Sequence, residues 1–300
     1  MAFKTNNGIF IKLLFIVLCK PLFSDINVYS HRHYESDKIL FKKFTEETGI
    51  KINVIKGSAD QLIQRLVSEG ANSPADILLT VDAGRLERAK SAGILQPIKS
   101  EKLTKNIPNE MRDEEGYWFG LTVRSRVIIY SPDRVNIDEL STYEELINPK
   151  WKGRIVARSS NNIYNQSLLA SLIIANGREN ALSWAKGVRK NMARSPRGSD
   201  RDQIRAVASG LADVAIANTY YLGILANSSK KADREVATKV SVFFPNQKGR
   251  GSHINVSGGG VTASSQNKDK AIQFLEFLSN SESQEIFGKV NHEYPVRIEN

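Results

Sequence analysis

The sequence predicts an α/β protein made of two lobes that are joined by two crossing strands. Its 300 residues are 41% hydrophobic and 25% charged, which is the composition of an ordinary globular protein with one large or two medium domains. From Asp25 onward, short apolar strands alternate with amphipathic helices, and this pattern indicates a largely parallel sheet. The β-rich segment 118–130 interrupts the alternation, so we expect it to cross from one lobe to the other.

The first lobe is predicted from three strand-and-helix pairs at the start of the chain. The first of its helices has Ile39, Leu40 and Phe44 at helical spacing and is expected to end at Gly49. The expected strands are 26–30, 50–55 and 75–79, and the expected helices are 37–48, 60–68 and 83–92.

The second lobe is predicted from the middle of the chain, and the end of the chain returns to the first. A strand at 240–244, stopped by Pro245, is the expected return crossover, and the glycines at 258–260 are predicted to form a flexible turn near the hinge. Lobe 1 is therefore predicted to comprise 25–123 plus 245–300, with C-terminal helices that can reach both lobes, and lobe 2 to comprise 124–244. The remaining expected elements are helices at 142–147, 166–176, 181–190, 202–209, 268–278 and 282–287, and strands at 154–157 and 213–217.

Residues 1–24 have the layout of a secretory signal peptide. Lysines and no acid precede a short apolar run, 13–19, that is too short to span a membrane. We therefore expect cleavage near 19–24 and a periplasmic protein. The sole cysteine, Cys19, would leave with this leader, which excludes disulfides and thiolate metal sites from the mature chain. Loss of the three leader lysines lowers the net charge from +10 to +7.

Tyrosines recur in three loops that each follow a predicted strand and open into a helix. The first loop holds His31, His33 and Tyr34, the second holds Tyr164, and the third holds the pair Tyr220 and Tyr221. Ligands bind beyond the strand ends of open α/β sheets, so we expect these loops to converge in a cleft between the lobes. Each tyrosine taken alone is typical of a packing residue. Their joint placement favours a site.

The third of these loops follows the apolar strand 213–217. Side-chain oxygens of Asn218 and Thr219 are expected to cap the helix that starts there. The backbone N–H groups and the dipole at such a helix start favour negative charge, so phenolates are expected to form there more easily.

A cluster of phenolic oxygens suits a hard, highly charged cation. The unperturbed pKa of tyrosine is about 10, so only a strong Lewis acid would hold several phenolates at neutral pH. Calcium and magnesium prefer carboxylates and water, and softer ions prefer thiolate or imidazole. These preferences favour Fe(III). A nearby cation such as Arg124, at the expected crossover, could balance the charge of four phenolates.

Other functional signals are weaker. A basic run between Lys186 and Arg201 is interrupted by acids, and it is more typical of a solvated or docking face than of a nucleic-acid site. The sequence contains neither an HExxH nor a GxSxG motif, so we expect no enzyme. A monomer is expected.

The chain resembles the ferric-ion-binding extracytoplasmic solute-binding proteins of ABC iron importers, in particular the cyanobacterial ferric-binding members. The resemblance covers nearly the whole mature chain. It is carried by Asn27-Val28-Tyr29-Ser30-His31-Arg32-His33-Tyr34, Ser73-Pro74-Ala75-Asp76-Ile77, Asn148-Pro149-Lys150-Trp151-Lys152-Gly153, Ala212-Asp213-Val214-Ala215-Ile216-Ala217-Asn218-Thr219-Tyr220-Tyr221, and Gly258-Gly259-Gly260-Val261 with Phe274-Leu275-Glu276-Phe277-Leu278. The tyrosine pair after a strand of this kind is the most specific of these motifs.

The resemblance implies a type II-like periplasmic-binding-protein fold in which two crossover strands form the hinge of a transferrin-like clamp, with an ABC permease of the inner membrane as partner. It implies a metal site with Tyr34, Tyr164, Tyr220 and Tyr221 as phenolate ligands and His33 as an imidazole ligand. Relatives that use a glutamate and an exogenous phosphate place that glutamate where this chain has Val81, so an anion-independent site is expected here.

The resemblance leaves open whether His33, Arg124 or water completes the shell, and whether Fe(II) also binds. Two alternatives remain at this point. One is a binding protein for a small anion or organic solute, with Arg124 or Arg126 as a clamp. The other is a secreted non-haem iron enzyme, which would typically need two histidines and a carboxylate.

Overall fold

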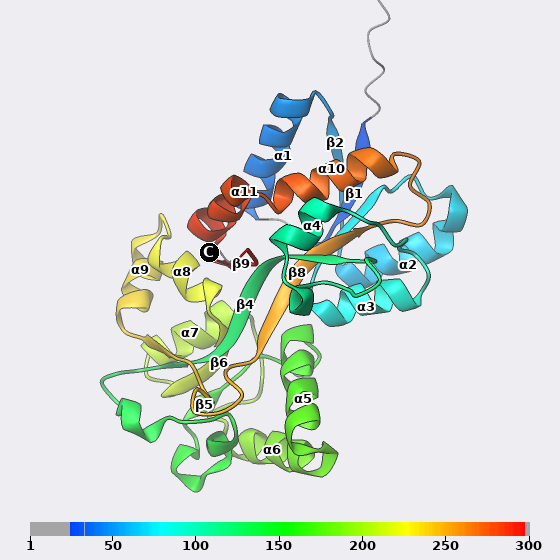
Figure 1. Cartoon of the computed structure of the whole chain (residues 1–300). Helices are drawn as coiled ribbons and strands as arrows, with labels where there is room; N and C mark the ends of the chain where they lie inside the picture. Colours follow the sequence, from blue (N-terminus) through cyan, green and yellow to red (C-terminus); the bar gives the residue numbers. More distant parts are fainter. Residues whose placement is uncertain (1–24, 33, 298–300) are drawn as a thin grey trace, which may run out of the picture.

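A computed structural model describes residues 25–32 and 34–297 and contains one nine-stranded sheet that runs through two lobes (Figure 1). The predicted signal peptide, Cys19 and His33 lie outside the described residues. Among the helices that the structure describes, none has the length and apolar character needed to cross a bilayer. The strands are β1 (Ile26–Ser30), β2 (Ile52–Lys56), β3 (Ile77–Val81), β4 (Phe119–Tyr130), β5 (Ile155–Val156), β6 (Val214–Asn218), β7 (Ser241–Phe243), β8 (Ile254–Val261) and β9 (Tyr294–Pro295).

The main path of the sheet has the order β2-β1-β3-β8-β4-β6-β5. The pairs β1–β2, β1–β3 and β5–β6 are parallel, whereas β8 and β4 run antiparallel to their neighbours. The sheet is therefore mixed rather than largely parallel, because each lobe ends its parallel set against a crossover strand. The two-lobed α/β fold predicted from the sequence is confirmed.

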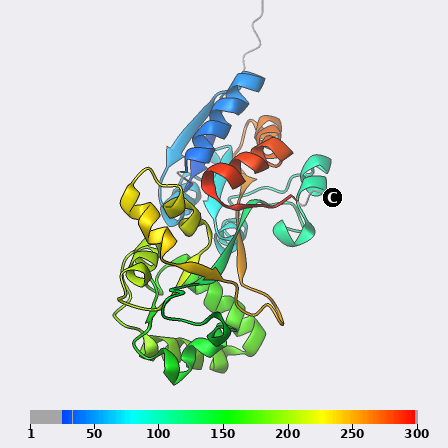
Figure 2. The same ribbon diagram turned by 90° about the vertical axis from the view of Figure 1, so that its left-hand side faces the viewer.

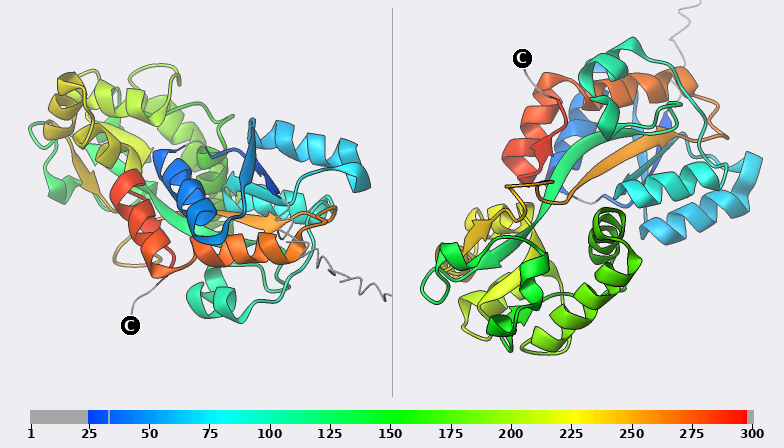
Figure 3. Two further views of the ribbon diagram at one scale, coloured as in Figure 1. Left: turned by 90° about the horizontal axis from the view of Figure 1, so that it is seen from above. Right: turned by 60° about the horizontal axis from the view of Figure 1, so that its bottom comes forward.

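Helices cover the sheet in both lobes, as the views from the side, above and below show (Figures 2 and 3). Gly49, in the left-handed region with a φ of 74°, ends α1 as expected. The helices are α1 (Glu35–Thr48), α2 (Ala59–Glu69), α3 (Ala83–Ser91), α4 (Glu101–Asn106), α5 (Ile163–Asn176), α6 (Arg178–Asn191), α7 (Asp200–Ala208), α8 (Tyr220–Ala226), α9 (Lys231–Thr238), α10 (Lys268–Leu278) and α11 (Ser281–Ile286), with a π-helix at Phe287–Asn291.

Three buried apolar clusters define the two lobes. One draws on residues between Ile26 and Val123 and between Val256 and Val296. The other two lie on opposite faces of the lobe 2 sheet. Alternate residues of β4 point to each face, so Ile128 enters one cluster and Val127 and Ile129 enter the other. Each lobe therefore has a hydrophobic core of its own.

The strand that returns to lobe 1 is β8, not the predicted strand at 240–244. β8 pairs with β4 over Phe119–Ser125 and with β3, whereas β7 pairs only with the last residues of β4. The glycines at 258–260 lie inside β8 and do not form the expected turn. A Cβ on Gly258 would stand 2.2 Å from the carbonyl oxygen of Phe119, and one on Gly260 would stand 2.3 Å from that of Tyr117. Close packing of β8 against the backbone of residues 117–119 therefore requires glycine at these positions.

The segment between β7 and β8 packs on lobe 2. The backbone N–H of Asn246 donates to Ser141 O at 2.8 Å, and its side-chain oxygen accepts from the N–H of Tyr143 at 3.1 Å. The residue boundaries of the two lobes remain a prediction, and the structure shows the crossing at β4 and β8.

Candidate metal centre

Three tyrosine hydroxyls that are distant in sequence converge between the lobes. The hydroxyl of Tyr220 lies 3.4 Å from that of Tyr34 and 3.5 Å from that of Tyr164. The ring of Tyr221 packs against Tyr220 with centroids 4.2 Å apart. The structure therefore brings together all four of the tyrosines expected from the sequence.

Three of these tyrosines lie in the first turn of a helix in lobe 2, Tyr164 in α5 and the pair Tyr220 and Tyr221 in α8. α5 begins at Ile163, three residues earlier than predicted, because the side-chain oxygen of Asn162 accepts from the N–H of Tyr164 at 3.0 Å and caps the helix. Tyr220 is the first residue of α8 and is almost fully buried. Tyr164 and Tyr220 therefore enter the cleft from helix starts.

The caps expected for α8 are not formed. Thr219 has helical backbone angles and makes no side-chain cap hydrogen bond. The side-chain oxygen of Asn218 accepts instead from the buried guanidinium of Arg126 at 3.2 Å. The hydrogen bond of Asn218 to a buried charge that is distant in sequence therefore replaces the expected helix cap. α8 itself is only seven residues long.

Tyr34 is supplied by lobe 1 from the loop between β1 and α1. It is the N-cap residue of α1, in extended conformation, and its N–H donates to Asp37 at 3.2 Å. The guanidinium of Arg32 lies 5.0 Å from the Tyr34 ring centroid and is paired with Asp37 at 3.0 Å and with Glu293 at 3.1 Å. A buried ion-pair network therefore fixes the loop that carries Tyr34.

Three arginines surround the ring of Tyr164. The guanidinium carbons of Arg124, Arg158 and Arg126 lie 5.0, 5.5 and 5.9 Å from its centroid. Arg124 donates to Ser257 at 2.5 Å, and Arg126 is bound by Asp200 at 2.5 Å. Arg124 and Arg126 are both almost completely buried, so positive charge is built into the wall of the site.

Burial raises the pKa of three of the four tyrosines. Desolvation is the largest cause of the raised pKa of Tyr34, followed by the neighbouring phenols and Glu293, while Arg32 opposes the rise. The pKa values of Tyr220 and Tyr221 are raised for the same main reason, again with contributions from neighbouring tyrosines. At neutral pH these groups are therefore neutral phenols, and a cation that bound them as phenolates would have to displace their protons.

A cavity of about 420 Å³ opens onto the tyrosines from both lobes. Tyr34, Tyr164 and Tyr221 line it together with three arginines, Arg85, Arg158 and Arg201, and its described lining residues include no carboxylate. Val81, where relatives of the phosphate-dependent kind were expected to carry glutamate, also lines it. His31 lies on the same wall, with its Nδ1 3.2 Å from the carbonyl oxygen of Gly57. His33 lies outside the described residues.

Asp82 is a site residue whose interlobe contact the sequence did not reveal. Its backbone has a φ of 83°, which is uncommon for a residue other than glycine, and its side chain is fully buried. Its carboxylate accepts from Ser167 on α5 at 2.7 Å and from Asn255 on β8 at 2.9 Å. It therefore joins lobe 1 to lobe 2 beside the tyrosines. The only local signal was an acidic residue directly after a strand.

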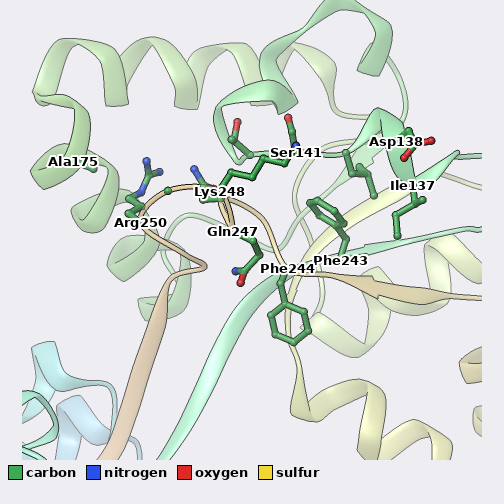
Figure 4. Close-up of a pocket in the computed structure, with 13 residues that line it drawn as sticks. Ile137, Asp138, Ser141, Ala175, Phe243, Phe244, Gln247, Lys248 and Arg250 are labelled. Atoms are coloured by element: carbon green, nitrogen blue, oxygen red, sulfur yellow. The ribbon is translucent and has the colours of Figure 1, made fainter.

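Within the described residues, no three His, Cys, Asp or Glu side chains gather as a metal site, so the donors that converge are phenolic. A larger cavity, of about 970 Å³, lies elsewhere on lobe 2 and is lined by Phe243, Phe244 and residues of the segments 137–142 and 246–250 (Figure 4). None of the four tyrosines lines it.

Two lobes that are linked by crossing strands and that enclose a donor-lined cavity define a solute-binding protein. The chain belongs to the family of bacterial extracellular solute-binding proteins, whose pattern matches residues 72–300.

Individual relatives and solved structures of this family show which members the chain is similar to. Iron uptake protein A1 of Synechocystis is 55% identical, over 91% of this chain and 76% of the relative. The major ferric iron-binding protein of Neisseria meningitidis is 30% identical, over 92% of this chain and 82% of the relative. A Trichodesmium structure in complex with iron and citrate has a TM-score of 0.87 and 56% identity, over 91% and 86%. The ferric binding protein from Campylobacter jejuni has a TM-score of 0.88 and 45% identity, over 91% and 87%.

Proposed function

We propose that this protein binds Fe(III) outside the cytoplasm and delivers it to an ABC importer. The approach of the hydroxyls of Tyr34 and Tyr164 to within 3.5 Å of the Tyr220 hydroxyl, beside Tyr221, carries the proposal. Phenolate oxygens are hard anionic donors that suit a trivalent hard cation. The names of the relatives, iron uptake and ferric iron-binding proteins, support the same ion.

The four tyrosines act as phenolate ligands in this proposal, and Arg124 supplies compensating positive charge. Burial of Arg124 by itself lowers its pKa, but Tyr164, Tyr220 and acidic neighbours outweigh this effect and raise it. The guanidinium therefore stays charged beside the phenolates. Because the phenols of the metal-free site are neutral, binding of Fe(III) releases protons.

Lobe 2 supplies Tyr164, Tyr220 and Tyr221, so it receives the ion first. Closure about β4 and β8 then brings in Tyr34 from lobe 1. The closed form docks on a membrane permease, where opening of the lobes or reduction of the metal frees the ion. The leader 1–24 would direct the chain to the periplasm.

The purified protein loaded with Fe(III) should be coloured by a phenolate-to-iron charge-transfer band, with one iron per chain by elemental analysis. Tyr220→Phe combined with Tyr221→Phe should abolish the band. Tyr117→Phe is the matched control, because Tyr117 packs beneath Lys90 in lobe 1 away from the cluster. A colourless complex, or a double variant that keeps the colour, would count against the proposal.

Capture of a small anion is a second candidate, and one observation favours it. Arg85, Arg158 and Arg201 line the cavity, and the buried Nε of Arg85 has no hydrogen-bond partner. A clamp formed by Arg126 is less well supported, since Asp200, Asn165 and Asn218 already bind this guanidinium. Elemental analysis separates the two candidates, because an anion-binding protein would contain no stoichiometric iron.

A further inference from the structure

The segment that follows α11 is firmly held in lobe 1. Residues Phe287–Asn291 form a π-helix, an uncommon element that is frequent at functional sites, and His292 follows in the left-handed region with a φ of 57°. Glu293 is 2% exposed and accepts from Asn291 at 2.6 Å, Arg32 at 3.1 Å and Ser257 at 3.3 Å. Because these partners are themselves buried in lobe 1, the position of His292 is fixed.

The side chain of His292 packs directly against α8 of lobe 2, at Gly223. A Cβ built on Gly223 would lie 2.6 Å from both Cβ and Cγ of His292 and 3.0 Å from its Cδ2. Atoms do not approach so closely, so any residue other than glycine at this position would force the two elements apart. Gly223 has no left-handed backbone that would require glycine, and glycine inside a helix is less stable than alanine. The close approach of His292 is therefore what demands glycine here.

The same helix carries two of the proposed ligands. Gly223 lies two residues after Tyr221 and three after Tyr220, so a displacement of α8 at Gly223 also moves both hydroxyls. The Tyr220 hydroxyl stands 3.4 Å from that of Tyr34 on lobe 1. Metal–ligand distances tolerate changes of only about 0.2 Å, and closely packed contacts transmit small shifts. The distance between His292 and α8 therefore bears on the geometry of the metal site.

We propose that His292 is a positioning residue: its contact with Gly223 sets how far α8 advances toward lobe 1, and so places Tyr220 and Tyr221 for the metal. This inference rests on the proposed function. His292 does not touch the metal. It acts through the backbone of α8, and the buried Arg32–Glu293 pair fixes its own position.

The test is a double-mutant cycle with Gly223→Ala, His292→Gly and the combination, read by iron affinity and by the wavelength of the charge-transfer maximum. Gly223→Ala should lower affinity at least about tenfold, as loss of a ligand-orienting contact does, and shift the maximum. His292→Gly should lower affinity less, since glycine accepts the left-handed backbone at this position. The combination should lie closer to wild type than Gly223→Ala alone, because the new methyl group occupies the space that the imidazole vacates.

Gly249→Ala is the matched control, since the nearest atom to its new Cβ is 3.8 Å away, and it should leave both readouts unchanged. A Gly223→Ala variant with wild-type affinity and spectrum would overturn the inference, as would failure of His292→Gly to rescue it. Thermal unfolding of each variant identifies misfolding, and rescue of the spectrum by the second substitution shows that the defect was positional. Absence of a charge-transfer band in the wild-type protein would instead contradict the proposed function itself.

Discussion

The two lobes contribute to the cleft in different ways. Lobe 2 presents Tyr164 and Tyr220 from the first turns of α5 and α8, backed by Arg126 and Asp200. Lobe 1 presents Tyr34 from a loop, and its charged network reaches from Arg32 to the far end of the chain at Glu293. Lobe 2 thus carries three of the four tyrosines on regular elements, whereas lobe 1 supplies one tyrosine and the ion pairs that hold its loop. Under the proposed function, this difference implies that lobe 2 binds the ion and lobe 1 closes over it.

The largest expected effect is a steep rise of iron affinity with pH. The slope of this rise gives the number of protons released on binding, and substitution of a tyrosine in one lobe shows how many of them that lobe contributes. Since burial raises the pKa of Tyr34, Tyr220 and Tyr221, these phenols stay protonated in the metal-free protein and lose protons on binding. Each released proton contributes about tenfold in affinity per pH unit, so these three phenols alone give about a thousandfold per pH unit. Chelator competition at two pH values measures it, and Tyr34→Phe should reduce the count by one. An affinity independent of pH would contradict phenolate ligation.

The buried ion pairs test whether each lobe depends on its own network. Glu293→Ala leaves Arg32 with one carboxylate fewer in lobe 1, and Asp200→Ala removes the carboxylate of Arg126 in lobe 2. Asp200→Ala should lower the free energy of unfolding by about 3–5 kcal/mol, because it leaves the buried charge of Arg126 without its carboxylate. Glu293→Ala should lower it by less, because Asp37 still pairs with Arg32. Urea denaturation measures this loss.

Lys42→Ala is the control for these two substitutions, since its pair with Glu46 is solvent-exposed and should contribute less than about 1 kcal/mol. If loss of either buried carboxylate were as mild as this control, its network would not be what stabilises that lobe.

Single tyrosine substitutions should separate binding from closure. Tyr164→Phe is expected to lower iron affinity by at least about a hundredfold, the upper range for loss of groups that merely orient a ligand. Tyr34→Phe should lose less affinity and keep a coloured complex, but it should remain more open. Chelator competition and small-angle scattering measure the two properties. Equal affinity losses with equal closure would remove the proposed asymmetry between the lobes.

His253, at the hinge between the lobes, should make stability fall in mild acid. Burial is the main cause that lowers its pKa to about 4, with Arg126 and Arg124 contributing and Asp82 opposing. The unfolded chain takes up this proton near pH 6.5 but the folded protein does not until about pH 4, so stability is complete above about pH 6.5 and declines below it. The expected loss is about 2 kcal/mol between about pH 6.5 and 4.5.

His253→Gln should flatten this part of the stability profile, measured by urea unfolding across the same range. A variant with the same acid slope as wild type would assign the slope to other groups.

Much of the fold follows from local patterns. The segments near 26–30, 119–130 and 214–218 were predicted as strands because runs of apolar and β-branched residues favour extended structure. α1 and its end at Gly49 follow from helical spacing and a glycine stop. Boundaries that depend on distant groups were missed. Residues 258–260 of β8 were predicted as a turn, but their glycines allow close packing against a neighbouring backbone. α8 lacks the expected cap from Asn218 because the side-chain oxygen of Asn218 accepts from Arg126.

The sequence by itself determined the alternation of strands and helices, and through its resemblance it indicated the four tyrosines and the ion they suit. Only the tertiary structure decided which hydroxyls meet, that Asp82 joins the lobes, and that Glu293 pairs with a residue 261 positions away. Periodicity and turn chemistry act over a few neighbouring residues, so one sequence displays them directly. A contact between distant residues depends on how whole elements pack, and no local pattern records it.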